Sequence, residues 1–172
     1  MLTYHPAGWI PVLRWRGFRG PARLSRVRDF PLHSGALLGK KKPRIPVQVL
    51  ITPVTPFQQN CALLWCPDTL RGAVVDPGGD TDKVLAAARK AGVTVEKILV
   101  THAHIDHAGA TARLARELAV PIEGPHRDDQ FWIDLLPEQG ERYGFPPAEA
   151  FSPDRWLMHG DTVTVGKLAL TV

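Results

Sequence analysis

The feature that most restricts the fold of this chain is a histidine-rich segment that directly follows an apolar one. Three of the seven histidines lie within six positions of residues 101–107, THAHIDH, and the largely apolar residues 97–100, KILV, precede them. A short apolar run bounded by polar residues predicts a buried strand. In open α/β folds the functional site commonly lies at the carboxyl end of such a strand. The arrangement therefore predicts an α/β domain with a site at this strand end.

The residue types in this segment suit a metal site. Alternate residues of an extended segment project to one side, so His102 and His104 can share one cation, whereas Asp106 and His107 point elsewhere. Imidazole nitrogens and a carboxylate favour zinc, with iron or manganese as alternatives, and their combination favours two ions held close together. The competing interpretation is a polar loop whose histidines only form hydrogen bonds.

Apolar periodicity elsewhere predicts strands that alternate with helices, which indicates an α/β fold. Helical stripes predict one helix that ends at Gly92 and another that contains Leu114 and Leu118, with Arg113 and Glu117 paired on its outer side. A short helix is expected over residues 131–136. Period-two patterns predict strands at 47–51, 61–65, 73–75, 97–100 and 120–122, and a hairpin at 162–172.

Residues 1–46 differ in composition from the rest of the chain. They hold ten Lys and Arg residues, six prolines and one acidic residue, Asp29, whereas 11 basic and 16 acidic residues follow. We expect a disordered, basic extension at 1–46 and a structured domain at 47–172. Since the positive charge is confined to the extension, the net charge of +4 does not indicate a nucleic-acid partner. An organelle transit peptide and an extension from an upstream start codon remain open for this segment.

Cysteine content and apolar runs bear on the compartment. Cys61 and Cys66 lie five residues apart on what reads as one strand, so their side chains leave from opposite faces and a disulfide between them is not expected. Free thiols favour a reducing compartment. No apolar run approaches the roughly 20 residues that span a bilayer. We expect a cytoplasmic protein without a membrane partner, with organelle targeting as the lesser alternative.

Three stretches of the sequence resemble one family. Residues 101–107, T-H-x-H-x-D-H after an apolar strand, resemble the signature of the metallo-β-lactamase superfamily. Residues 75–78, VDPG, resemble its short strand that ends in an acidic residue, and residues 55–61, TPFQQNC, resemble the start of its glyoxalase II-like branch. The resemblance covers residues 47–172. It implies an α/β fold of the αββα-sandwich type, of which this chain supplies mainly the first half, with the inner face of its first sheet uncovered.

The resemblance also implies roles for individual residues. Asp106 would orient a hydroxide held between two zinc ions and accept its proton, which makes it the catalytic residue. Asp76 and Thr101 would support the metal ligands from outside the metal centre. The first ion would be held by His102 and His104 and the second by Asp106 and His107.

The activity implied is hydrolysis of a thioester such as an acyl-glutathione by attack of the metal-bound hydroxide. The thiol formed from a thiolate leaving group has a pKa of about 8.5, so the thiolate needs little help from a general acid to leave. The partner expected is therefore a small-molecule thioester. A mononuclear iron enzyme that oxidises a glutathione persulfide shares a similar histidine motif and is the alternative.

The sequence departs from the family pattern after residue 107. The family completes its centre with a third histidine, a bridging aspartate and a final histidine from later segments, and none of these motifs follows here. His126 and His159 lie outside such motifs and are not expected to be ligands. We therefore expect a C-terminally truncated chain, and a non-catalytic fragment that holds one ion weakly is a third interpretation.

Overall fold

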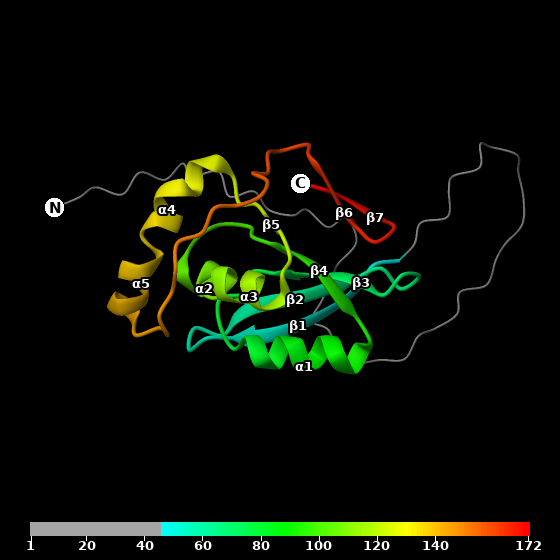
Figure 1. The fold of residues 1–172 in the computed structure, drawn as a ribbon, viewed down its shortest axis with the longest axis horizontal. Coiled ribbons are helices and arrows are strands. Elements are labelled where there is room, and N and C mark those ends of the chain that lie inside the picture. Colours follow the sequence, from blue (N-terminus) through cyan, green and yellow to red (C-terminus); the bar gives the residue numbers. More distant parts are fainter. Residues whose placement is uncertain (1–45) are drawn as a thin grey trace, which may run out of the picture.

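The computed structural model describes residues 46–172, so the extension predicted at 1–46 lies outside the described residues apart from Pro46. In the described part, a five-stranded sheet has the order β1-β2-β3-β4-β5, and a separate hairpin pairs β6 with β7 (Figure 1). The pairs β1/β2 and β2/β3 are antiparallel, whereas β3/β4 and β4/β5 are parallel. The strands are β1 (Gln48–Val54), β2 (Gln59–Trp65), β3 (Arg71–Val75), β4 (Thr94–Leu99), β5 (Ile122–Glu123), β6 (Thr162–Val165) and β7 (Leu168–Thr171).

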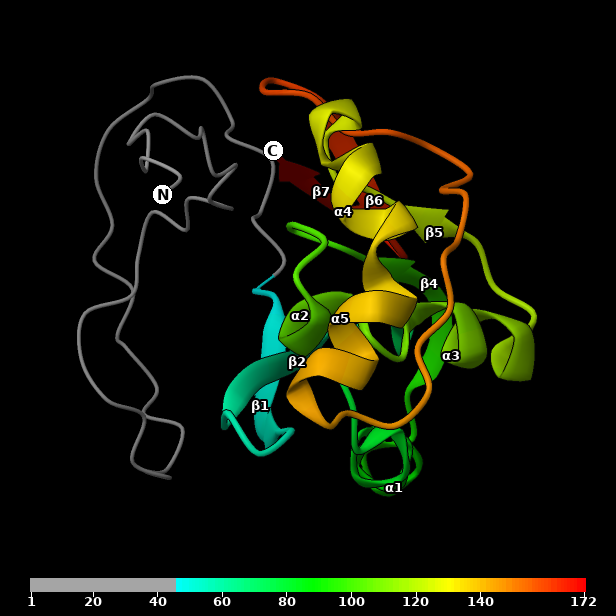
Figure 2. The same ribbon diagram turned by 90° about the vertical axis from the view of Figure 1, so that its left-hand side faces the viewer.

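Helices cover one face of the five-stranded sheet (Figure 2). The stripe predicted before Gly92 forms α1, and Gly92 ends that helix in the left-handed conformation at φ 67°. Leu114 is fully buried on α3, but Arg113 hydrogen-bonds the hydroxyl of Thr81 and does not pair with Glu117 as predicted. No helix among residues 46–172 is long and apolar enough to cross a membrane. The helices are α1 (Thr81–Ala91), α2 (Ile105–Ala108), α3 (Thr111–Leu118), the 3₁₀ turn η1 (Arg127–Asp129), α4 (Gln130–Asp134) and α5 (Leu136–Tyr143).

The alternation of side chains along the central strands builds two cores. On β2, Leu63 packs into the core beneath the helices, whereas its neighbour Leu64 packs into a second core on the opposite face. On β4, Ile98 and Leu99 divide in the same way. Each fully buried aliphatic side chain of this kind contributes about 1.5–3 kcal/mol to stability. The strands at the centre of the sheet are therefore fixed in register by burial on both faces.

The hairpin β6–β7 lies against the second face of the sheet. Val163 and Val165 point inward from β6 and pack with Leu99 and Leu64 in the second core. The prediction that this inner face is uncovered is thus wrong for β3 and β4, because the hairpin presents an apolar face of its own. The expectation holds better at β1, where Ile51 remains 53% exposed. Of the predicted αββα architecture, the structure contains one layer of helices, the first sheet, and one hairpin that lies where the second sheet of the sandwich is expected.

The two cysteines are free, as predicted, and both are buried. Cys61 belongs to the core under the helices. Cys66 lies on the other side, where a Cβ atom at Gly166 of the hairpin turn would come within 3.0 Å of the Cys66 Cβ. Burial and the charge of Asp76 raise the pKa of Cys61 to about 12, so its thiol stays protonated at neutral pH.

Candidate metal centre

The histidine segment leaves the carboxyl end of β4 next to the end of β3, so two loops meet at one edge of the sheet. Asp76 directly follows β3, and Thr101 lies two residues after β4. The backbone N–H of Asp76 donates to the carbonyl of Leu99, which ties the two loops together at 2.9 Å. Parallel neighbours place their carboxyl ends at the same edge, and this is the reason that residues 25 positions apart can touch.

The carboxylate of Asp76 accepts most of the side-chain hydrogen bonds at this edge of the sheet. Asp76 is 5% exposed and has a positive φ of 52°, a conformation that aspartate tolerates better than most residues. Its Oδ1 accepts the backbone N–H of Thr101 at 2.7 Å, and its Oδ2 accepts the Thr101 hydroxyl at 2.6 Å. The same Oδ2 lies 3.0 Å from Nδ1 of His107. A buried carboxylate is thus stabilised by three donors from the histidine segment.

The bond to Asp76 determines which nitrogen His107 can offer to a metal. A carboxylate can only accept, so the Nδ1 of His107 carries the proton in this contact and Nε2 is left with a lone pair. Burial alone would lower the pKa of His107, but the hydrogen bond and charge of Asp76, together with the charge of Asp106, raise it overall. Nε2 lies 3.6 Å from Oδ2 of Asp106, so both groups face the same space.

The ring of His102 is also linked to Asp76, but through the hydroxyl of Thr101. The Thr101 hydroxyl donates its single hydrogen to Asp76, so it must accept from Nδ1 of His102, which lies 3.0 Å away. This leaves Nε2 of His102 free to bind a cation. Burial lowers the pKa of His102 to about 4, and the positive charge of a protonated His107 adds to the effect. His102 is therefore neutral at neutral pH, as a metal ligand must be.

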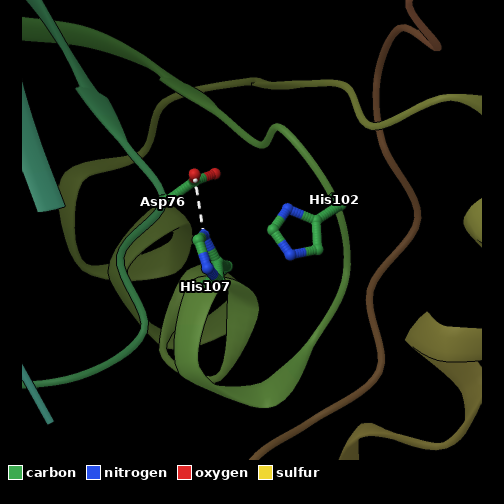
Figure 3. Close-up of side chains that lie close together, drawn as sticks. All are labelled: Asp76, His102 and His107. Carbon is green, nitrogen blue, oxygen red and sulfur yellow. Dashed lines mark hydrogen bonds and ion pairs between the residues drawn. The ribbon is translucent and has the colours of Figure 1, made fainter. Parts of the chain in front are cut away.

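The structure brings Asp76, His102 and His107 together: one ligand atom from each lies within 4.8 Å of the others (Figure 3). The rings of His102 and His107 are 4.0 Å apart between centroids. His104 and Asp106 fall outside this trio, although the ring of His104 lies edge-on to that of His102 at 4.8 Å. The pairing of His102 with His104 and of Asp106 with His107 stays a prediction.

Asp76 could serve this centre either as a ligand or as a support. Its oxygens already accept from three donors, and the Nδ1–H of His107 takes the oxygen that faces the histidines. A carboxylate behind a metal-binding histidine typically fixes the ring and raises its basicity. The hydrogen bonds therefore favour a supporting role for Asp76, with Thr101 as the link to His102.

The donor set fits a borderline divalent cation. Two imidazole nitrogens with lone pairs and the Asp106 carboxylate are the ligand types that zinc and iron accept in proteins. The residues present are thus chemically suited to a metal ion.

Close backbone packing fixes the height of the histidine segment above the sheet. A Cβ atom at Gly78 would lie 1.6 Å from the carbonyl oxygen of Asp106, so no larger residue fits there. Gly109 is similarly constrained by the carbonyl of Ile105 at 2.6 Å, and the N–H of Ala110 donates to the carbonyl of Pro77. The VDPG stretch therefore does more than provide Asp76, because its main chain also supports α2.

Several residues at the centre were not predicted from the sequence. Gln59 on β2 places its side-chain amide 3.1 Å from Nδ1 of His107, and Asp129 and Gln139 hydrogen-bond the main chain around His104. Gln59 lies within the stretch 55–61 that resembles the glyoxalase II-like branch, and this resemblance is a signal that could have indicated it. His126 caps η1, accepting the N–H of Asp128 at Nδ1, and is not part of the trio.

Comparison with known proteins agrees with this geometry. The model of the metallo-beta-lactamase superfamily matches residues 54–172, and the chain belongs to this superfamily. It is 40% identical over 111 residues to the hydroxyacylglutathione hydrolase GloC of Haemophilus influenzae, a match that covers 64% of this chain and 52% of the relative. The chain thus spans about half the length of that curated relative.

Solved structures support the same fold. The BLEG-1 B3 metallo-beta-lactamase matches with a TM-score of 0.62 and 26% identity, over 72% of this chain and 59% of that protein. A protein crystallised in a di-iron-bound form matches with a TM-score of 0.59 and 28% identity, over 66% of this chain and 56% of that one. The predicted family and α/β fold are confirmed, and the structure represents part of the complete fold.

Proposed function

We propose that this chain contributes the first metal-binding half of a hydrolase that cleaves a thioester such as an acyl-glutathione. The observation that carries the proposal is a chain of hydrogen bonds that ends at Asp76. Asp76 accepts from Nδ1 of His107 and from the Thr101 hydroxyl, and this hydroxyl accepts from Nδ1 of His102, so both Nε2 atoms are left as ligands. The hydroxyacylglutathione hydrolase of Haemophilus influenzae, at 40% identity, supports the choice of substrate class.

Two zinc ions are the proposed cofactor. The short distance between the rings of His102 and His107, 4.0 Å between centroids, supports two neighbouring ions. When bound, they would lower the pKa of a water molecule toward about 7 and polarise the carbonyl of the substrate. The residues that would hold them are His102 and His104 for the first ion and Asp106 and His107 for the second.

The remaining residues orient these ligands and handle a proton. Asp76 and Thr101 hold the two imidazoles in the required tautomer, so no rearrangement is needed on binding. Asp106, whose Oδ2 is 3.6 Å from Nε2 of His107, would accept the proton of the attacking water at a carboxylate oxygen. A thiolate leaves without a general acid because its pKa is only about 8.5. A thioester therefore suits a centre with few acid–base groups.

The free, buried Cys61 and Cys66 support action in a reducing compartment, and we propose the cytoplasm. The proposed partner is the small thioester itself, without a nucleic acid or membrane.

Oxidation of a persulfide at a single iron is the second candidate. Imidazole and carboxylate ligands do not discriminate between zinc and iron, and one matching structure holds two irons. Iron content together with oxygen consumption in the presence of glutathione persulfide would favour this alternative over thioester hydrolysis.

Metal analysis and a matched substrate pair test the proposal. The purified chain is loaded with zinc and dialysed, and hydrolysis of an acyl-glutathione thioester is compared with that of the corresponding oxygen ester. We expect retained zinc, preference for the thioester, and loss of both zinc and turnover in His102→Ala. His159→Ala changes an exposed histidine outside the centre and serves as the control.

Absence of retained zinc after dialysis would contradict the metal function and identify the chain as a non-catalytic fragment. Retained zinc without thioester turnover would contradict the hydrolase activity of this chain. Equal turnover in His102→Ala and the unaltered chain would contradict the assigned ligand.

A further inference from the structure

His104 differs from the other two histidines of the segment in how it is held. Side-chain hydrogen bonds fix the rings of His102 and His107, whereas none is found for the ring of His104 within residues 46–172. The His104 residue is exposed, and its ring has edge-on contacts with the rings of His102 and Trp132, both at 4.8 Å between centroids. Something other than a ring hydrogen bond must therefore orient it.

The main chain on both sides of His104 is held by side chains from one later segment. The N–H of Ala103 donates to Oδ2 of Asp129 at 3.2 Å, and the N–H of Ile105 donates to Oε1 of Gln139 at 3.2 Å. His104 is the residue before α2, and the first N–H groups of a helix have no partner within the helix. Gln139 supplies that partner for Ile105, which is 3% exposed.

Gln139 uses both ends of its amide. Its Nε2 donates to the carbonyl of Trp132 at 3.1 Å while its Oε1 accepts from Ile105, and the residue is only 9% exposed. One buried side chain thus joins the start of α2 to the helix that carries Trp132. The ring of Trp132 then meets His104 at an interplanar angle of 88°. The hydrogen bonds to the main chain on both sides of His104 and the ring contact with Trp132 thus all act on His104.

We propose that Asp129, Trp132 and Gln139, carried by η1, α4 and α5, form a clamp that positions His104, with Gln139 as its central positioning residue. Asp129 and Gln139 fix the backbone before and after His104, and Trp132 limits the rotation of its ring. The consequence for metal affinity rests on the proposed function, because it requires that His104 binds an ion. Prior orientation of a ligand reduces the entropy lost on binding.

Gln139→Leu tests the clamp against a matched change. This variant removes both amide bonds at nearly constant size, whereas Gln130→Leu removes an exposed glutamine on α4 that bonds only Asp134. Loss of a hydrogen-bonding group that orients a metal ligand typically lowers metal affinity about 10- to 100-fold. We expect a decrease of this size in zinc affinity for Gln139→Leu, by competition with a chromophoric chelator, and no change for Gln130→Leu. Gln139→Glu keeps an oxygen for the N–H of Ile105 and should restore part of the affinity.

Solution NMR of the metal-free chain separates the clamp from the metal function. In Gln139→Leu the amide hydrogen of Ile105 should exchange faster, and the His104 ring protons should lose the ring-current shift from Trp132. Asp129→Ala, at a half-buried position, should act in the same direction at Ala103 and remains usable if Gln139→Leu does not fold.

Unchanged His104 ring shifts in both clamp variants would overturn the proposal. Equal zinc affinity of Gln139→Leu and Gln130→Leu would also overturn it. If the unaltered chain binds no zinc, the proposed function fails, but the metal-free spectra still decide whether the clamp orients His104.

Discussion

Asp76 and His107, 31 residues apart, are joined by a hydrogen bond of 3.0 Å between Oδ2 and Nδ1. This contact links the end of β3 to α2 and selects the nitrogen that His107 presents. Since Oδ2 of Asp76 also accepts from the Thr101 hydroxyl, one carboxylate determines the tautomers of two histidines. The metal-binding capacity of the segment therefore depends on a residue outside it.

Asp76→Asn tests this dependence directly. The amide presents a donor where the carboxylate accepted, so at least one of its three bonds becomes a donor–donor contact. We expect a loss of zinc affinity of about 10- to 100-fold and a pKa of His107 that falls from its raised value. Chelator competition and histidine NMR titration measure the two effects. Asp82→Asn makes the same change at an exposed site on α1, and equal behaviour of the two variants would refute the role of Asp76.

Gly78→Ala tests the packing beneath the histidine segment. The added Cβ would lie 1.6 Å from the carbonyl oxygen of Asp106, so the backbone must shift. Overpacking of this kind costs about 1–3 kcal/mol, measurable as a lower midpoint of urea denaturation. Gly140→Ala on α5 is the control because its Cβ would meet neighbours at 3.6 Å, an ordinary contact. A stability of Gly78→Ala equal to that of the unaltered chain would contradict the close approach.

The pH dependence of zinc binding follows from the opposite shifts of two histidines. The pKa of His107 is raised, so a proton competes with zinc at this residue as soon as the pH falls below that raised value. The pKa of His102 is lowered to about 4, so its proton competes only in more acidic solution. We expect affinity to fall about tenfold per pH unit below the pKa of His107 and more steeply near pH 4. Affinity that is independent of pH between 5 and 7 would contradict this order of titration.

Thiol labelling tests the burial of the two cysteines. Cys61 and Cys66 are both 0% exposed, and the pKa of Cys61 is raised to about 12 by burial and by the charge of Asp76. The nucleophile in alkylation is the thiolate, so we expect slow reaction of Cys61 with iodoacetamide in the folded chain and fast reaction in denaturant. Mass spectrometry of timed samples identifies the labelled residue. Rapid labelling of Cys61 in the folded chain would show that the core near Asp76 opens readily.

Local patterns predicted much of the fold. The apolar stripe on residues 84–88 and the stop at Gly92 correctly defined α1, and alternation in residues 61–65 correctly defined β2, because burial on known faces leaves a period in the sequence. The predicted pairing of Arg113 with Glu117 was wrong. Spacing along a helix permits such a contact, but the Thr81 hydroxyl, brought close by packing of α3 near α1, binds the guanidinium.

The candidate centre was predictable only in part. The segment 101–107 and Asp76 were identified from motifs, since their spacing reflects the ligand geometry. Asp129 and Gln139 were missed because they act across 26 and 34 residues through single side-chain bonds to the backbone. Such contacts depend on tertiary packing and leave no periodic pattern.

The position of a bound zinc ion tests the central claim most directly, and anomalous diffraction from crystals grown with zinc measures it. The account predicts one zinc ion about 2.0–2.1 Å from Nε2 of His102 and a second at a similar distance from Nε2 of His107, with Asp76 still accepting from Nδ1 of His107. Zinc bound directly to the Asp76 carboxylate, or no zinc beside these two histidines, would contradict it.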